Sequence, residues 1–483
     1  MDTQRSPEAS QETRNDGHAV SSGSSRNPAG GVAKNMAKNM AKHIAKHIAK
    51  NKSTLLLDLS LLRDNAAFRT VVIARTLSVF SLGMLTVAVP VQIQETTGSP
   101  MQVGIAMALG GGGAFAGLLA GGVLADRWDR RKLILFARSV CGLGFAALAV
   151  NGFSSSPSVL AIYALALWDG FFSALGVTAL LAATPFLVGR ENLGAAGQFN
   201  MLTVRMGGIL SPALGGMVIA SFGVGWNYLT AAIGALLTVA QLMRLPPMPP
   251  ARREPQHPLR ALGAGIGYLF VNRLVGAVVA VGALVSLGGG VRILLPALAE
   301  DVYRVGPSAV GVMYAAAPLG ATVAALTGGW LGGFARSGAL LLASGAAAFV
   351  ALGSLGFIGD PVVAFVALAG FGYLSSIASL LQFTLVQRHT PEHLLGRVNG
   401  LWAAQAVTGD AFGALALGSM TRVVPLTSAV LIFSLVALLS SGAMAIGFRS
   451  LRFASLKKNE DLPSTAADKS ERPQPQLLKS EKA

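Results

Sequence analysis

Residues 122–132 read Gly122-Val123-Leu124-Ala125-Asp126-Arg127-Trp128-Asp129-Arg130-Arg131-Lys132, and the charged part of this stretch, 126–132, separates two long apolar runs. The runs cover approximately residues 101–125 and 133–152. A helix needs about 20 apolar residues to cross a hydrocarbon layer of roughly 30 Å, so each run is long enough to span a membrane. The stretch therefore predicts two transmembrane helices joined by a short basic loop.

The whole chain has the composition of a membrane protein. Of its 483 residues, 52% are hydrophobic and 12% are charged, and the mean hydropathy is +0.57. In soluble domains roughly a quarter of all residues are charged. The low share in this chain excludes a water-exposed surface for most of it. We expect an all-α polytopic membrane protein with twelve transmembrane helices. Their predicted ranges are 68–94, 101–125, 133–152, 158–187, 196–221, 225–245, 272–298, 308–333, 338–357, 361–387, 397–420 and 425–448.

Lysine and arginine residues gather in alternate predicted loops. The loops opposite them contain little more than Arg304 and Arg422. The positive-inside rule places the basic loops, and with them both termini, in the cytoplasm. The net charge of +16 then reflects loops and tails that face anionic lipid, which explains it better than nucleic-acid binding does. The basic loops contain Arg127, Arg130, Arg131, Lys132, Arg190, Arg252, Arg253, Arg260, Arg336, Arg388 and Arg397.

The proline-rich and charged stretch 245–259 divides the spans into two sets of six. Each set contains a proline followed by Gly-Arg and a glycine-rich helix, at Pro185 and at Pro391. Two parallel six-helix repeats are typical of transporters that work by alternating access. The predicted organisation is an N-terminal extension (1–52), an N-terminal six-helix bundle (53–245), a cytoplasmic linker (246–271), a C-terminal six-helix bundle (272–448) and a cytoplasmic tail (449–483).

The extension and the tail have the polar composition of disordered segments. Within the extension, residues 33–52 form a four-residue repeat, AKNM-AKNM-AKHI-AKHI-AKNK. Two interpretations stay open: a basic helix on the inner membrane surface, or repetition inherited from repeated DNA, with the true start at Met36 or Met40.

The stretch 122–132 resembles the signature loop of the major facilitator superfamily, Gly-x-Leu-Ala-Asp-Arg-x-Gly-Arg-(Lys/Arg), in spacing, residue types and position after the second span. The resemblance implies the major facilitator fold and a charged latch that holds the outward-open state. The gating residues that it implies are Gly122, Asp126, Arg127, Arg130, Arg131 and Glu191.

Within this latch, the resemblance implies that Asp126 faces the start of the eleventh helix and that Arg130 pairs with Glu191. The sequence departs from the family pattern at Asp129, where glycine is usual. In the second half Gly333 stands where the acid would be, so we expect a charged latch in the first half alone.

Five ionisable residues lie inside predicted spans: Arg75, Asp169, Arg205, Arg292 and Asp410. A charge in a membrane usually faces a cavity or a partner, because burying it alone is costly. By resemblance, helices 1, 4, 7 and 10 line the central cavity, which favours Arg75 and Arg292 as substrate-cavity residues. A carboxylate withdrawn from water can exchange a proton near neutral pH, so Asp169 and then Asp410 are the proton-coupling candidates. The alternative is a static pair of either acid with Arg205 or Arg75.

Uncharged polar and aromatic residues complete the candidates for the substrate cavity. They could bind hydroxyl groups or stack on an aromatic ligand, or they could equally serve as interhelical hydrogen bonds and packing. The main candidates are Trp168, Gln382 and Gln405, and the others are Gln92, Gln94, Phe171, Phe172, Ser375, Ser376, Ser379 and Trp402.

Four long stretches narrow the resemblance to the enterobactin (catecholate siderophore) exporters of enteric bacteria: residues 55–94, 167–193, 251–262 and 394–414. The likeness is collinear over nearly all of 53–448. It implies proton-driven export of a catecholate siderophore, a large flexible triester of catechol amides, from cytoplasm to periplasm across the bacterial inner membrane. It leaves open the oligomeric state, for which a monomer is the default of the superfamily, and a periplasmic or outer-membrane efflux partner.

Several other classes of protein fit less well. A broad-specificity drug efflux antiporter of the same fold is the main alternative, and a membrane receptor or lipid flippase is a more distant one. No Gly-x-x-x-x-Gly-Lys-(Ser/Thr) phosphate loop is present, and His389 and His393 have no recognisable carboxylate or cysteine partner. We therefore expect no cofactor, no metal and no enzymatic activity. The single cysteine, Cys141, permits no intramolecular disulfide.

Overall fold

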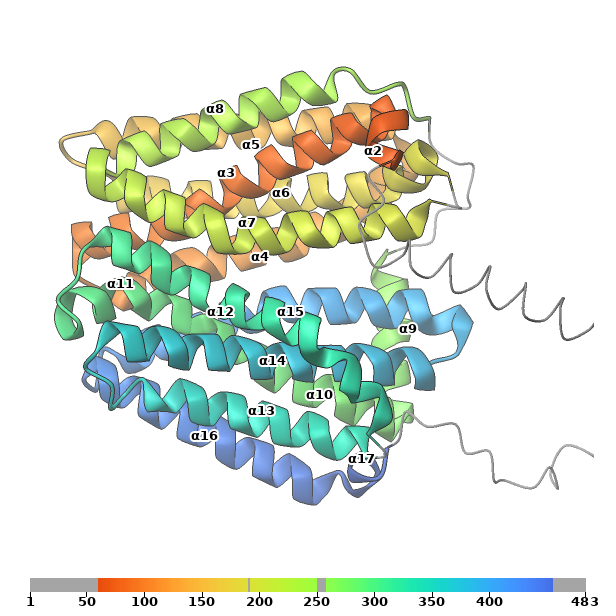
Figure 1. The fold of residues 1–483 in the computed structure, drawn as a ribbon, viewed down its shortest axis with the longest axis vertical. Helices are drawn as coiled ribbons and strands as arrows, with labels where there is room; N and C mark the ends of the chain where they lie inside the picture. Colours follow the sequence, from red (N-terminus) through yellow and green to blue (C-terminus); the bar gives the residue numbers. More distant parts are fainter. Residues whose placement is uncertain (1–59, 190–191, 250–257, 335, 455–483) are drawn as a thin grey trace, which may run out of the picture. The chain divides into compact units, whose positions relative to one another are not determined.

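The computed structural model describes residues 60–189, 192–249, 258–334 and 336–454, and every regular element in these ranges is helical (Figure 1). Helices dominate because a backbone in hydrocarbon must satisfy its own hydrogen bonds. The all-α prediction is confirmed. The repeat at 33–52 and the tail beyond 454 lie outside the described residues.

The N-terminal bundle contains six long helices preceded by a short one. Their bounds are α2 Ser60–Asp64, α3 Ala66–Thr97, α4 Pro100–Arg127, α5 Arg130–Phe153, α6 Val159–Val188, α7 Leu193–Phe222 and α8 Val224–Leu242. Side chains that accept backbone N–H groups fix several helix starts: Asn65 begins α3 and Ser158 begins α6. Within the bundle α4 packs on α6, α5 on α6 and α8, and α3 on α7 and α8.

The C-terminal bundle repeats this packing pattern. Here α12 packs on α14, α13 on α14 and α16, and α10 on α15. This arrangement is consistent with the predicted fold of two six-helix repeats (Figure 1). The bounds are α9 Pro258–Val271, α10 Arg273–Leu287, η1 Gly288–Leu294, α11 Leu295–Ala297, η2 Leu298–Val302, α12 Pro307–Thr327, η3 Gly328–Gly333, α13 Ser337–Ser354, α14 Pro361–His389, α15 Glu392–Met420, α16 Leu426–Gly447 and α17 Arg449–Arg452.

Ten helices within the described residues are long and apolar enough to cross a membrane. They include a continuous span over Arg273–Val302 that combines α10, η1, α11 and η2. The long helices α8 and α15 are not among the ten but occupy equivalent places to other spans within the bundles. The arrangement is consistent with the twelve predicted spans.

The range predicted as a linker, 246–271, contains an unpredicted helix. Residues 258–271 form α9, which lies across the end of the C-terminal bundle (Figure 1). The Tyr268 hydroxyl donates a hydrogen bond of 2.9 Å to the His389 carbonyl oxygen, and α9 packs on α15. Asn272 separates α9 from α10 by accepting the Val275 N–H.

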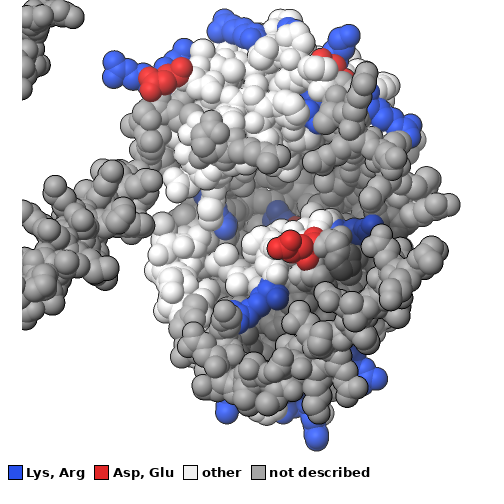
Figure 2. Space-filling view, turned by 90° about the vertical axis from the view of Figure 1, so that its right-hand side faces the viewer, with Lys and Arg blue, Asp and Glu red and all other residues white. Residues whose placement is uncertain are grey.

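The two bundles touch at one end of the molecule and separate at the other. We call these the α11 end and the α9 end. At the α11 end α7 crosses α12 so closely that a Cβ added to Gly216 would lie 2.8 Å from Gly311 Cα. Buried apolar residues of both bundles, including Val103, Ile219 and Ile293, form one continuous core there. Figure 2 looks at the α9 end and shows a recess between the bundles with basic side chains around it.

Candidate functional site

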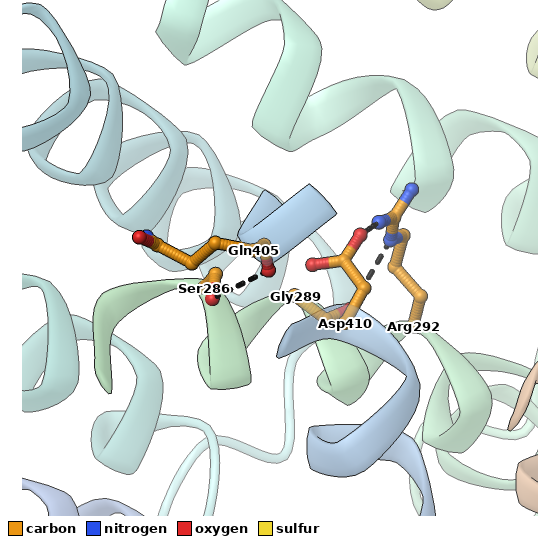
Figure 3. Close-up of polar contacts among 5 residues, drawn as sticks. All are labelled: Ser286, Gly289, Arg292, Gln405 and Asp410. Atoms are coloured by element: carbon orange, nitrogen blue, oxygen red, sulfur yellow. Dashed lines mark hydrogen bonds and ion pairs between the residues drawn. The ribbon is translucent and has the colours of Figure 1, made fainter. Parts of the chain in front are cut away.

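An ion pair faces the space between the two bundles. The Arg292 guanidinium, on η1, contacts the Asp410 carboxylate, on α15 (Figure 3). The side chains are 38% and 32% exposed, so the pair borders an open cavity and is not sealed in the core. Arg292 Nε also donates to the Gly289 carbonyl oxygen at 3.1 Å, which fixes the orientation of the guanidinium.

The glycine run 288–290 makes this contact sterically feasible. The Asp410 carboxylate lies directly against Gly289, where a Cβ would overlap Oδ1. The chain forms a 3-10 helix over Gly288–Leu294 before the helical span resumes. The Tyr314 hydroxyl donates to the Arg292 carbonyl oxygen at 2.7 Å and so anchors this irregular segment to α12.

Three cavities meet around the pair, with volumes of about 590, 450 and 230 Å³. The first is lined by both Arg292 and Asp410, the second by Arg292 and the third by Asp410. We call this group the central cavity. Residues of both bundles line it, as an alternating-access site requires.

Amide and indole groups form one wall of the central cavity. Gln382 Nε2 donates to Gln405 Oε1 at 3.2 Å, and Trp402 Nε1 donates to Gln382 Oε1 at 3.2 Å. Ser286 is linked to the Gln405 carbonyl oxygen at 3.5 Å (Figure 3). The structure therefore places the predicted Gln382 and Gln405 beside Asp410, in the cavity of about 230 Å³.

Arg205 of α7 lines the same cavity as Arg292, from the opposite bundle. Its side chain is half-buried, and among the described residues no hydrogen bond or ion pair is found for it. The predicted alternative, in which Arg205 is neutralised by Asp410, is wrong, because the aspartate pairs with Arg292.

A second charged group lies inside the N-terminal bundle. Asp169 of α6 lines the cavity of about 590 Å³, and its Oδ1 is buried without a hydrogen-bond partner among the described residues. Two groups on α5 affect its carboxylate: Arg138 through its positive charge and Cys141 through hydrogen bonding. Arg138 is 5% exposed and lies against Gly176, about two turns along α6 from Asp169.

Arg138 was not among the predicted site residues. It follows the basic loop 127–132 by less than two turns of helix. In the sequence Arg138 is therefore easily taken for one of the positive charges of that loop. It nevertheless lies inside the apolar run 133–152, and the criterion that selected Asp169 would have selected it.

Two predicted substrate-cavity residues lie elsewhere. Arg75 lines a separate cavity of about 230 Å³ between α3, α6 and α7, and the charge that acts on it is that of Arg138. Trp168 is 42% exposed, donates to the Val140 carbonyl oxygen at 3.0 Å and stacks near Phe172 on the outside of α5 and α6. Neither residue lines the central cavity, because the rotation of each helix turns it away.

The signature loop is held by contacts within the N-terminal bundle. Asp129, the departure from the family pattern, accepts the Lys132 N–H at 3.1 Å as the N-cap of α5 and the Met248 N–H at 3.1 Å. Arg131 donates to the Met243 carbonyl oxygen at 2.6 Å. Asp129 therefore connects this loop to the segment that follows α8.

Arg130 lies over the Phe186 ring at 4.3 Å, and its backbone N–H donates to the Met248 carbonyl oxygen. Gly122 and Arg127 are exposed at the end of α4. The predicted latch remains a prediction, since Glu191 and the Asp126 side chain lie outside the described residues.

Among the residues that the structure describes, no group of three or more His, Cys, Asp or Glu side chains is placed to hold a metal ion. The charged groups of the site are thus two acids and several arginines. Such groups can bind an anion, exchange a proton or change partners, which are the steps of coupled transport.

Comparisons with known proteins agree with this arrangement. The model of the Major Facilitator Superfamily matches residues 71–414. The chain is 51% identical over 380 residues to proteins named enterobactin exporter EntS, from Escherichia coli O139:H28 (strain E24377A / ETEC) and Shigella boydii serotype 18 (strain CDC 3083-94 / BS512). In each case the match covers 78% of this chain and 91% of the relative.

Solved structures show the same fold at low sequence identity. The nucleoside transporter NupG superimposes with a TM-score of 0.64 at 13% identity, over 80% of this chain and 98% of that chain. A bacterial homolog of the human lysosomal transporter Spinster gives a TM-score of 0.60 at 14% identity, over 80% and 96%. These similarities concern the fold alone.

Proposed function

Because this multi-pass membrane chain belongs to the major facilitator superfamily, whose members are transporters and not enzymes, we propose that it exports enterobactin or a related catecholate siderophore. Export runs from cytoplasm to periplasm across the bacterial inner membrane and is coupled to proton entry. The protein acts as a monomer with both termini in the cytoplasm.

The observation that carries this proposal is a cationic cavity between the bundles in a chain that is similar to enterobactin exporters. Arg205 and Arg292 border it from opposite bundles, and Tyr314 and Ser379 add hydroxyl groups. Catechols offer adjacent oxygens that accept hydrogen bonds and ring faces that attract guanidinium groups. A free Arg205 is therefore suited to bind substrate at once, whereas Arg292 must first leave Asp410.

The contacts between bundles support a transport direction. They lie at the α11 end, while the recess is at the α9 end, which carries the basic loops (Figure 2). Under the positive-inside rule the α9 end faces the cytoplasm, so the cavity is open to the side where the siderophore is made. Rocking of one bundle against the other then moves the opening to the periplasm.

Asp169 is the proposed coupling acid, and Asp410 is the second choice. Asp169 borders the cavity, and its Oδ1 accepts no hydrogen bond from any described residue. This oxygen is therefore available to bind a proton. Asp410 would act differently, because it is the partner of Arg292. A catecholate oxygen that binds Arg292 would displace the Asp410 carboxylate, which could then take up a proton. Substrate and proton thus meet at two acids that line one cavity of about 590 Å³.

The first test is siderophore secretion by iron-starved, enterobactin-producing bacteria that lack their own exporter gene. Complementation with this chain should restore catecholates in the medium, measured by chromatography, and Asp169→Asn at equal membrane abundance should fail to restore them. If the intact chain leaves the siderophore inside the cells but lowers accumulation of unrelated dyes, the protein is a broad drug antiporter and the substrate proposal is wrong.

Proton coupling needs a separate test in inverted membrane vesicles. Enterobactin should accumulate inside vesicles whose lumen is acidic, and a protonophore should abolish the accumulation. Asp169→Asn should still allow counterflow of substrate without a gradient. Accumulation that continues after the protonophore would exclude proton coupling while leaving siderophore export in place. Purified protein in liposomes tests the requirement for a periplasmic partner. Transport of enterobactin in the absence of other proteins would show that no partner is needed.

A further inference from the structure

A cavity of about 1110 Å³ lies at the α9 end, beside the central cavity and separate from the charged groups described above. Residues of α9, α10, α15, α16 and α17 line it, together with Phe115 of α4. Its walls are mainly apolar, with Leu269, Phe270, Leu401 and Phe448 among them. We call this cavity the groove. Gln405 borders both the groove and the central cavity.

Two arginines, Arg273 and Arg449, line the groove, and because both side chains are exposed we take them to mark its mouth. Arg273 begins α10 and Arg449 begins α17, and these two helices pack against each other. Both side chains are exposed, and no hydrogen bond or ion pair is found for either one within the described ranges. No acidic residue is among those that line the groove, so its mouth carries uncompensated positive charge.

The surface next to the mouth is apolar and uncovered. Phe270 and Val271, at the end of α9, are 83% and 84% exposed. Side chains of this kind at the end of a membrane-embedded bundle are covered by lipid, because water would solvate them poorly. The groove therefore opens where acyl chains and headgroups meet, and in the proposed orientation this is the cytoplasmic leaflet.

From this combination we propose that the groove is a binding site for an anionic phospholipid. An acyl chain occupies the apolar walls between α9, α10 and α15, and the phosphate lies between Arg273 and Arg449. Charge complementarity selects the anionic lipid over a zwitterionic one, since a basic residue at an anionic membrane surface attracts it. The bound lipid would fill the seam between α4 and the C-terminal bundle, and the site is independent of the substrate.

The test measures lipid retention by the purified full chain, using native mass spectrometry. Phosphatidylglycerol and phosphatidylcholine of matched chain length are added in separate samples, and a third sample contains phosphatidylglycerol together with an excess of inorganic phosphate. We expect phosphatidylglycerol to be retained in preference to phosphatidylcholine. Arg273→Gln/Arg449→Gln should weaken its retention roughly 30-fold, given the attraction expected for two basic residues.

The matched control is Arg69→Gln/Arg244→Gln, which removes two exposed arginines at the same end of the N-terminal bundle and should retain the lipid like the unchanged protein. A groove-filling variant, Ala280→Phe, keeps both arginines and should also lose the lipid. Equal retention of the two lipids, equal loss in the control, or full competition by inorganic phosphate would overturn the proposal. If Ala280→Phe does not fold, the two arginine variants still decide the question.

Discussion

The N-terminal and C-terminal bundles carry their charges in opposite ways. In the C-terminal bundle one arginine meets one aspartate, and the Arg292–Asp410 pair is about one-third exposed to the cavity. In the N-terminal bundle two arginines, Arg75 and Arg138, form a group with one acid, Asp169, and atoms of all three side chains are buried without hydrogen-bond partners in the described part of the chain.

The difference indicates two roles. A balanced pair beside open space can separate at low cost, since water or substrate can solvate either partner. A buried group with excess positive charge is costly to disturb and holds its acid in one place. We therefore assign partner exchange to the C-terminal pair and proton storage to the N-terminal group, and the following experiments can break this division.

The largest effect is expected for Arg138→Gln. Removing this guanidinium leaves the Asp169 carboxylate without the positive charge that acts on it from α5, and an uncompensated buried charge typically costs about 3–5 kcal/mol. The variant should melt at a much lower temperature in detergent and should lose export. Arg138→Gln/Asp169→Asn removes both charges and should regain most of the thermal stability without regaining export. If the single variant is as stable as the parent, the two groups do not depend on each other.

Asp410→Asn should separate transport from stability. Arg292 then loses its partner but keeps access to the cavity, so we expect a stability loss of about 1 kcal/mol or less. Export should fall about tenfold, the effect of an interaction worth about 1.4 kcal/mol. Vesicle transport and thermal melting are measured on the same preparation. A melting temperature lowered as far as in Arg138→Gln would contradict the proposed contrast between the bundles.

Gly289→Ala should act through Asp410 alone. A Cβ at this position overlaps the carboxylate, so Asp410 must move away from Arg292. Export should fall several-fold, by less than in Asp410→Asn, because the acid remains present. Gly400→Ala is the matched control, since a Cβ there meets no atom within 4 Å. Equal vesicle transport by the two alanine variants would show that the position of the carboxylate is unimportant.

The smallest effect is expected at the two tryptophans. Trp168→Phe loses one hydrogen bond to a backbone carbonyl outside the cavity, worth about 1 kcal/mol of stability, and export should be unchanged. Trp402→Phe frees Gln382 in the cavity wall and should raise the substrate concentration needed for half-maximal transport. If Trp168→Phe alone impairs transport, Trp168 takes part in substrate binding and the central cavity extends to the outside of α6.

The sequence predicted the class of protein and its repeat organisation because both depend on local properties. Apolar runs of sufficient length identify membrane helices, and the signature loop at 122–132 indicates the family. Intramembrane ionisable residues such as Asp169 and Arg292 were also identifiable, since charge in an apolar run is conspicuous without any knowledge of packing. The prediction was incomplete where a charge adjoined a loop, as at Arg138.

Which charges meet was decided by the tertiary structure. Arg292 and Asp410 are 118 positions apart, and their contact depends on a 3-10 segment and on the space left at Gly289. Trp168 adjoins Asp169 in sequence but points out of the bundle while the acid borders the cavity. Hydropathy gives the length of a helix and its tendency to enter a membrane. The direction of each side chain is set by helix rotation and interhelical packing, which emerge only when all the helices are assembled.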